Sequence, residues 1–155
     1  MADTWVVNAS PLIALGNVGR VDLLTRLGRE VVLPPAVVEE VRRGRPVVLP
    51  AGAIELNAVE PARTVLMWGL GSGETEVLSY AVRNPHAEAI LDDLAARRCA
   101  QAHDVRTRGT VGVIIMAKQL GLIAAVRPVF DDLQRAGFYL SASVLQVALQ
   151  AAGES

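Results

Sequence analysis

Residues 4–15 read Thr-Trp-Val-Val-Asn-Ala-Ser-Pro-Leu-Ile-Ala-Leu, and this stretch decides the fold. The apolar run from Thr4 to Val7 predicts a buried strand that ends at Asn8. Pro11 is typical of the start of a helix, and the residues after it give that helix an apolar side. A strand that runs through a short turn into a helix is the repeating unit of α/β folds.

The same unit recurs along the chain. Further strands are predicted at 30–33, 87–91 and 104–107, with a weaker signal at 53–59. Helices are predicted at 21–27, 35–43, 72–83, 94–102, 109–120, 128–136 and 141–151. Strands that alternate with helices require crossover connections, so the sequence predicts an α/β fold with a mostly parallel sheet between two helical layers. We expect residues 1–155 to form a single domain, because the length suits one core.

Composition narrows the class of protein. Hydrophobic residues make up 52% of the chain and the net charge is -1, which excludes a disordered protein and argues against a DNA-coating one. Six of the 155 residues are aromatic, so we expect any single-stranded nucleic acid to be held mainly through its phosphates. Fourteen of the fifteen basic residues are Arg, which suits phosphate binding, but the base composition of the genome is the simpler explanation.

Targeting and redox signals are weak. Cys99 is the single cysteine, so an internal disulfide is excluded, and two histidines make a His-ligated metal site improbable. The first residues lack the basic and apolar regions of a signal peptide, and the apolar stretches 109–126 and 136–153 fall short of a membrane span. We expect a cytoplasmic protein with no membrane association.

Acidic residues provide the main functional signal. Asp92 and Asp93 directly follow a predicted strand, and adjacent carboxylates repel one another unless they are solvated or share a cation. One of them can instead cap the helix that starts at Leu94. The pair Asp131 and Asp132 also precedes a Leu, but a solvated helix start explains it.

Two glutamates lie beside apolar helix faces. Glu74 is in line with Val77 and Leu78, so it either stays in the solvated first turn or enters a polar pocket that contains cations. Glu76 points nearly the opposite way, where a role at the helix start is the simpler interpretation. Glu40 borders an apolar stripe and can face inward or outward.

Other polar residues are less informative taken singly. Glu39 can pair with Arg43 on the helix surface. Asn8 and Ser10 follow the first strand, where open α/β sheets bind ligands and where Asn and Ser are also ordinary cap residues. Arg97 and Arg98 follow the acidic pair by about one helical turn and suit either a phosphate contact or a solvated face.

Carboxylates that converge without His or Cys favour Mg²⁺ or Mn²⁺, which prefer oxygen ligands. Such ions support phosphodiester hydrolysis. Glycoside hydrolysis also uses paired carboxylates, but the few aromatics offer a poor sugar groove. A phosphoacceptor domain fits less well, because no acidic pair ends the first strand.

The order of several short segments resembles the PIN domain family, most closely the branch related to VapC-type toxins. The segments are Val6–Leu15, Val38–Val41, Gly73–Val77, Leu91–Arg97 and Gly109–Gly112. The resemblance covers nearly the whole chain. It implies a compact α/β/α domain and a Mg²⁺- or Mn²⁺-dependent ribonuclease, with a cognate antitoxin and a homodimer as partners.

The resemblance also implies site residues. Asn8, Glu40, Glu74 and Asp93 would be catalytic and metal-binding, with Asp92 beside them as a further metal ligand. Ser10 and Glu76 match further positions of the family and would contact the substrate, and the position of Arg97 and Arg98 after the acidic pair adds them as substrate contacts.

PIN nucleases usually place Asp where this chain has Asn8, and an amide oxygen brings no charge to a cation. Two hypotheses follow: a toxin-type endoribonuclease that hydrolyses RNA phosphodiesters, and a catalytically impaired PIN-like module that binds RNA or a protein partner. The apolar C-terminal helix, with Val144, Leu145, Ala148 and Leu149, fits dimerisation, antitoxin docking or core packing.

Overall fold

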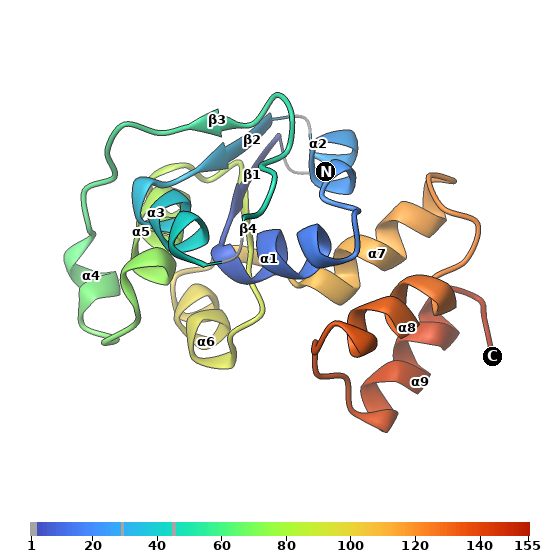
Figure 1. Cartoon of the computed structure of the whole chain (residues 1–155). Coiled ribbons are helices and arrows are strands. Elements are labelled where there is room, and N and C mark those ends of the chain that lie inside the picture. The colour runs from blue at the N-terminus through green and yellow to red at the C-terminus, as the bar shows by residue number, and fades with distance from the viewer. Residues whose placement is uncertain (1–2, 29, 45) are drawn as a thin grey trace.

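The computed structural model describes residues 3–28, 30–44 and 46–155. In these residues five parallel strands form one sheet in the order β3-β2-β1-β4-β5, so β1 lies at the centre (Figure 1). The strands are β1 (Thr4–Val7), β2 (Glu30–Leu33), β3 (Ile54–Glu55), β4 (Ala87–Ile90) and β5 (Arg106–Arg108).

Helices cover both faces of the sheet. They are α1 (Ala9–Asn17), α2 (Asp22–Leu27), α3 (Pro35–Arg43), α4 (Arg63–Leu66), α5 (Ser72–Arg83), α6 (Leu94–Ala102), α7 (Thr110–Gln119), α8 (Arg127–Arg135) and α9 (Ala142–Ala151). Helices α3 and α5 pack together in one layer and α2 and α7 in the other (Figure 1). The predicted three-layer α/β/α architecture with a parallel sheet is therefore confirmed.

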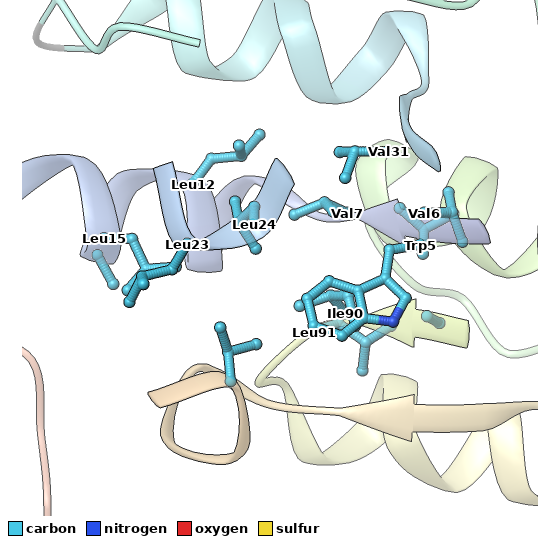
Figure 2. Close-up of a cluster of buried hydrophobic side chains, with 14 of the residues drawn as sticks. Trp5, Val6, Val7, Leu12, Leu15, Leu23, Leu24, Val31, Ile90 and Leu91 are labelled. Carbon is cyan, nitrogen blue, oxygen red and sulfur yellow. The ribbon is translucent and has the colours of Figure 1, made fainter. Parts of the chain in front are cut away.

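The core lies around β1. Trp5 is 2% exposed, and Figure 2 shows it in a cluster with Val7 of the same strand and Ile90 of β4. The backbone at Gly28 packs closely against the Trp5 ring, because a Cβ at this position would lie 3.3 Å from the indole. Each aliphatic side chain buried here stabilises the fold by about 1.5–3 kcal/mol.

The buried Cys99 lies in the same core, on α6. Burial raises the pKa of its thiol, which keeps the group protonated and poorly reactive. Within the described residues, no helix combines the length and the apolar character needed to cross a membrane.

Most predicted elements match the observed ones within two residues, and the differences have physical reasons. Helix α1 begins at Ala9 and not at Pro11. The N–H groups of the first turn have no acceptor within the helix, so a proline is tolerated at any position of that turn and does not mark its first residue. Asp104 has a φ of 56°, a left-handed conformation that does not fit a strand, and β5 begins at Arg106 and not at Asp104. The region before α5 departs most: the strand predicted at 53–59 is reduced to β3, and α4 was not predicted.

The parallel register fixes where polar residues collect. Val7 of β1 is level with Ile90 of β4, and Ile90 is level with Arg108 of β5. The backbone N–H of Asn8 then donates to the Ile90 carbonyl at 2.9 Å. Asn8 and the residues after β4 therefore emerge at one edge of the sheet, where sites of open α/β folds form.

Candidate active site

Asn8 lies at the centre of this edge. Its side chain is 4% exposed, yet no protein group within the described residues donates a hydrogen bond to its buried Oδ1. It occupies the N-cap position of α1 without making a side-chain cap bond. A buried polar atom without a partner is rare and costly, so it indicates a ligand or a water at this position.

Glu40 and the first turn of α5 approach the same atom. A Cβ built at Gly73 would lie 3.1 Å from Asn8 Oδ1 and 3.3 Å from Glu40 Oε1. Both oxygens therefore point into the space that a side chain at residue 73 would fill. The glycine lets α5 bring its N-terminus, with its positive end of the helix dipole, up to these oxygens.

Glu74 follows on α5 and is half-buried. Its Oε2 lies 2.7 Å from where a Cβ of Gly71 would be, so the carboxylate folds back over the first turn of its own helix. The sequence left open a place in the solvated first turn or in a polar pocket containing cations; the carboxylate lies in the first turn of α5 and also lines a cavity.

Asn8, Ser10, Glu40 and Glu74 line one cavity of about 320 Å³. Its other walls come from α1 and from the end of α8. Among the described residues, no Arg or Lys side chain lines this cavity. Two carboxylates therefore face one cavity without a basic side chain in its lining, beside an amide oxygen that also lacks a donor.

Asp92 is bound to the protein itself. The hydroxyls of Ser10 and Thr110 donate to its Oδ2 at 2.8 and 2.7 Å, and the backbone N–H of Thr110 donates to its Oδ1 at 2.8 Å. These bonds tie the end of β4 to the starts of α1 and α7. Asp92 thus orients Ser10 at the cavity wall but does not line the cavity.

Asp93 is exposed and caps α6, because its side chain accepts from the backbone N–H of Ala96 at 2.9 Å. The sequence favoured Asp92 over Asp93 as the cap of this helix, which is wrong, because the N-cap is Asp93. Like Asp92, it is not among the residues that line the cavity.

The remaining predicted contacts lie outside the cavity. Glu76 accepts from the backbone N–H of Ala36 at 3.0 Å, at the start of α3. Arg97 donates through Nε to the Leu91 carbonyl at 3.2 Å, and Arg98 is exposed on α6. Both Glu76 and Arg97 hold backbone groups in place.

The donor set suits a hydrated divalent cation. Asn8 Oδ1, Glu40 and Glu74 are oxygen donors at one cavity, and Mg²⁺ keeps several waters while it uses one or two carboxylates. Within the described residues, no three His, Cys, Asp or Glu side chains are grouped to hold a metal ion. The cavity accordingly offers two carboxylates and an amide, and the unpartnered Asn8 oxygen is the feature that fits a cation best.

The sequence did not indicate the far wall of the cavity. Ile13, Asn17, Leu133 and Phe138 line it together with the residues above. The spacing of Ile13 and Asn17 from Ser10 places all three on one face of α1, but nothing in the sequence pairs this face with α8.

This fold and this site define a class: an α/β/α domain that gathers acidic and amide oxygens at the carboxyl edge of a parallel sheet. Comparison with known families gives a match to the PIN domain over residues 4–154. The chain belongs to the PIN domain family, whose members are generally metal-dependent nucleases. No curated protein and no solved structure matches the chain.

Proposed function

We propose that this protein is a metal-dependent endoribonuclease that hydrolyses RNA phosphodiesters. One observation carries the proposal: the buried, unpartnered Oδ1 of Asn8 lies beside Glu40 at a cavity that Glu74 also lines, in a PIN domain. The proposed cofactor is Mg²⁺ or Mn²⁺.

Asn8, Glu40 and Glu74 would hold the cation. A divalent cation supplies positive charge that activates water and stabilises the charge developing on phosphorus. Gly73 keeps the space between Asn8 and Glu40 open, and Asp92 holds Ser10 at the wall where a phosphate would enter. The family resemblance adds Asp93 as a metal ligand and Glu76 as a substrate contact, and the position of Arg97 and Arg98 one helical turn after the acidic pair adds them as phosphate contacts. All four residues lie outside the cavity.

A specific observation also favours the second hypothesis, a PIN module that binds RNA or a protein without cleaving it. Asn8 replaces a carboxylate, while Asp92 and Asp93 are engaged in hydrogen bonds to the protein. The cavity is left with two carboxylates, which lowers the affinity expected for a cation.

The biological setting belongs to the same proposal. We propose that the protein is the toxin of a toxin–antitoxin pair, acts in the cytoplasm, and pairs with a cognate antitoxin and a second copy of itself. The support is the membership of the PIN family and the apolar surface of α9, where Val144 is 47% and Val147 65% exposed.

The test is Mn²⁺-dependent cleavage of a mixed single-stranded RNA by the purified protein. Glu40→Gln and Glu74→Gln should each lower the rate by about 10²-fold or more, because each removes a charge from the site. Glu39→Gln is the matched control, since Glu39 is exposed and pairs with Arg43 at 3.4 Å on the same helix.

Asn8→Asp separates the two hypotheses. Cleavage by the parent that Glu40→Gln abolishes establishes the nuclease. Cleavage gained only in Asn8→Asp means a PIN site silenced at one position. No cleavage by either protein, together with no Mn²⁺ binding by titration calorimetry, would contradict the nuclease and leave the binding module.

A further inference from the structure

The cavity extends well beyond the oxygens of the candidate active site. Ser10, Ile13, Ala14 and Asn17 line it at spacings of three and four residues, so one face of α1 forms its floor. Seven residues of helix rise about 10 Å, which separates Ser10 at the acidic end from Asn17 at the other.

Phe138 forms the wall at that far end and is held in a defined position. Gly137 has a φ of 99°, its N–H donates to Gln134, and the N–H of Phe138 donates to the Leu133 carbonyl at 2.9 Å. This is the Schellman ending of a helix, here of α8, and Leu133 and Phe138 both line the cavity.

The chemistry changes from one end of the cavity to the other. Apart from Glu40 and Glu74, the residues that line it are uncharged. The far part combines aliphatic side chains, the aromatic ring of Phe138 and the amide of Asn17, which has both donors and an acceptor. A flat, uncharged group with hydrogen-bonding edges fits such walls, whereas a phosphate does not.

We propose that this part of the cavity binds one base of a single-stranded RNA, which stacks on Phe138 while Asn17 hydrogen-bonds to the edge of the base. The inference rests on the proposed function, because it places the phosphate beside that base at Asn8, Glu40 and Glu74. Single-stranded RNA is commonly recognised by stacking unpaired bases on aromatic side chains and by bonds to their edges.

The first test measures base binding in the presence of Mg²⁺, because Glu40 and Glu74 would repel a nucleotide phosphate without a cation, and it involves no cleavage because mononucleotides contain no phosphodiester. The chain has two phenylalanines, and Phe130 is fully buried, so the ring protons of Phe138 can be assigned by comparison with Phe138→Leu. AMP, CMP, GMP and UMP are titrated one by one, with ribose 5-phosphate as the probe that lacks a base. We expect the Phe138 ring and the Ile13 methyl resonances to shift with one or more nucleotides and to stay in place with ribose 5-phosphate.

The second test uses variants and RNA affinity. Phe138→Leu keeps an apolar side chain but loses the stacking face, and we expect it to weaken binding of a short single-stranded RNA by about tenfold. Tyr139→Leu is the matched control: the neighbouring residue is 84% exposed and does not line the cavity, so the affinity should stay unchanged. Asn17→Ala should change which nucleotide gives the largest shift.

The outcomes separate this inference from the function on which it rests. Nucleotide-dependent shifts at Phe138 in a protein that cleaves nothing would support the base pocket and contradict the nuclease. RNA cleavage without such shifts, or equal shifts with ribose 5-phosphate, would overturn the base pocket and leave the nuclease standing. Equal losses of affinity in Phe138→Leu and Tyr139→Leu would overturn it as well.

Discussion

Asp92 and Asp93 are adjacent and carry the same side chain, but they differ in the number of bonds they accept. Asp92 accepts three, from Ser10 and Thr110, while Asp93 accepts one, from Ala96. Asp92→Asn replaces one of the acceptor oxygens with an NH₂ group, which faces the donors of Ser10 and Thr110. We expect this change to lower the free energy of unfolding by about 2 kcal/mol. Urea unfolding followed by circular dichroism measures the change.

Asp93→Asn is the matched control. Asn caps helices about as well as Asp, so this variant should stay within about 0.5 kcal/mol of the parent. Equal stability of the two variants would show that the bonds of Asp92 do not hold β4, α1 and α7 together.

The residues of the candidate site were predictable to different extents for a physical reason. Asn8 and Glu74 were singled out by local patterns, an apolar strand that stops at Asn8 and an apolar helix face that includes Glu74. Phe138 has no such pattern, because its place in the cavity depends on how α8 packs against α1. The hydrogen-bonding role of Asp92 depends on partners in α1 and α7, which a strand-end pattern does not reveal, whereas the partner of Asp93 lies in the helix that follows it.

At the level of elements, α5 closely approaches Asn8, the residue after β1, and helix α3 at Gly73. Gly73→Ala adds a methyl group 3.1 Å from Asn8 Oδ1 and 3.3 Å from Glu40 Oε1. Alanine also favours helix, so we expect the free energy of unfolding to change by less than about 1 kcal/mol. The Mn²⁺ affinity should fall by about tenfold or more, because both oxygens must move.

Titration calorimetry with Mn²⁺ and a urea unfolding curve check both parts. Gly112→Ala is the control, a helical glycine in α7 whose added methyl meets the flexible side chain of Arg108 at 2.9 Å. Unchanged Mn²⁺ affinity in Gly73→Ala would place the cation elsewhere.

The side chain of Glu154, near the C-terminus, binds the first backbone N–H groups of helix α8. Glu154 accepts from Lys118 Nζ at 2.8 Å and from the backbone N–H groups of Val126 and Arg127 at 2.7 and 3.3 Å. The hydrogen bond from Lys118, followed by that from Val126, holds the pKa of Glu154 below its ordinary value of 4.5. Because the folded-state pKa is lowered, the stabilisation is complete above pH 4.5 and is lost as the pH falls below it.

Comparison of the parent with Glu154→Gln by urea unfolding tests this. The parent should be more stable at neutral pH, and the difference should shrink as the pH falls below 4.5. Glu39→Gln, which alters an exposed pair with Arg43, should differ little from the parent at either pH. A difference for Glu154→Gln that is constant with pH would contradict the role of its charge.

Elements with a clear hydrophobic periodicity could be predicted from the sequence, whereas the irregular region between residues 46 and 71 could not. Helix α5 was predicted with its observed bounds, because glycines before it and Asn84-Pro85 after it mark both ends. Between residues 46 and 71 no clear period exists, and β3 pairs with β2 over two residues. Such a short edge strand is fixed by its neighbour and not by its own sequence.

At the scale of the whole molecule, α9 lies at the opposite end from α4 (Figure 1). Side chains of α7 and α9 line an apolar groove between the two helices. The groove has a volume of about 270 Å³ and includes Val111, Ile115, Val144 and Val147. No charged side chain lines it among the described residues. Exposed apolar surface of this kind is typical of an interface, and a two-fold dimer would cover it with the same surface of a second copy.

We therefore expect the parent protein to have twice the mass of the 16.5 kDa chain by light scattering, and Val147→Glu to have the mass of one chain. Val147 is 65% exposed, so the glutamate is solvated in the monomer and is buried without a partner only if a second copy covers it. Val48→Glu is the matched control, because Val48 is 79% exposed and lies outside the groove. A dimer in both variants would place the interface elsewhere, and a monomeric parent would contradict the dimer. The candidate active site does not share a residue with the groove, so Mn²⁺ binding by Val147→Glu should equal that of the parent.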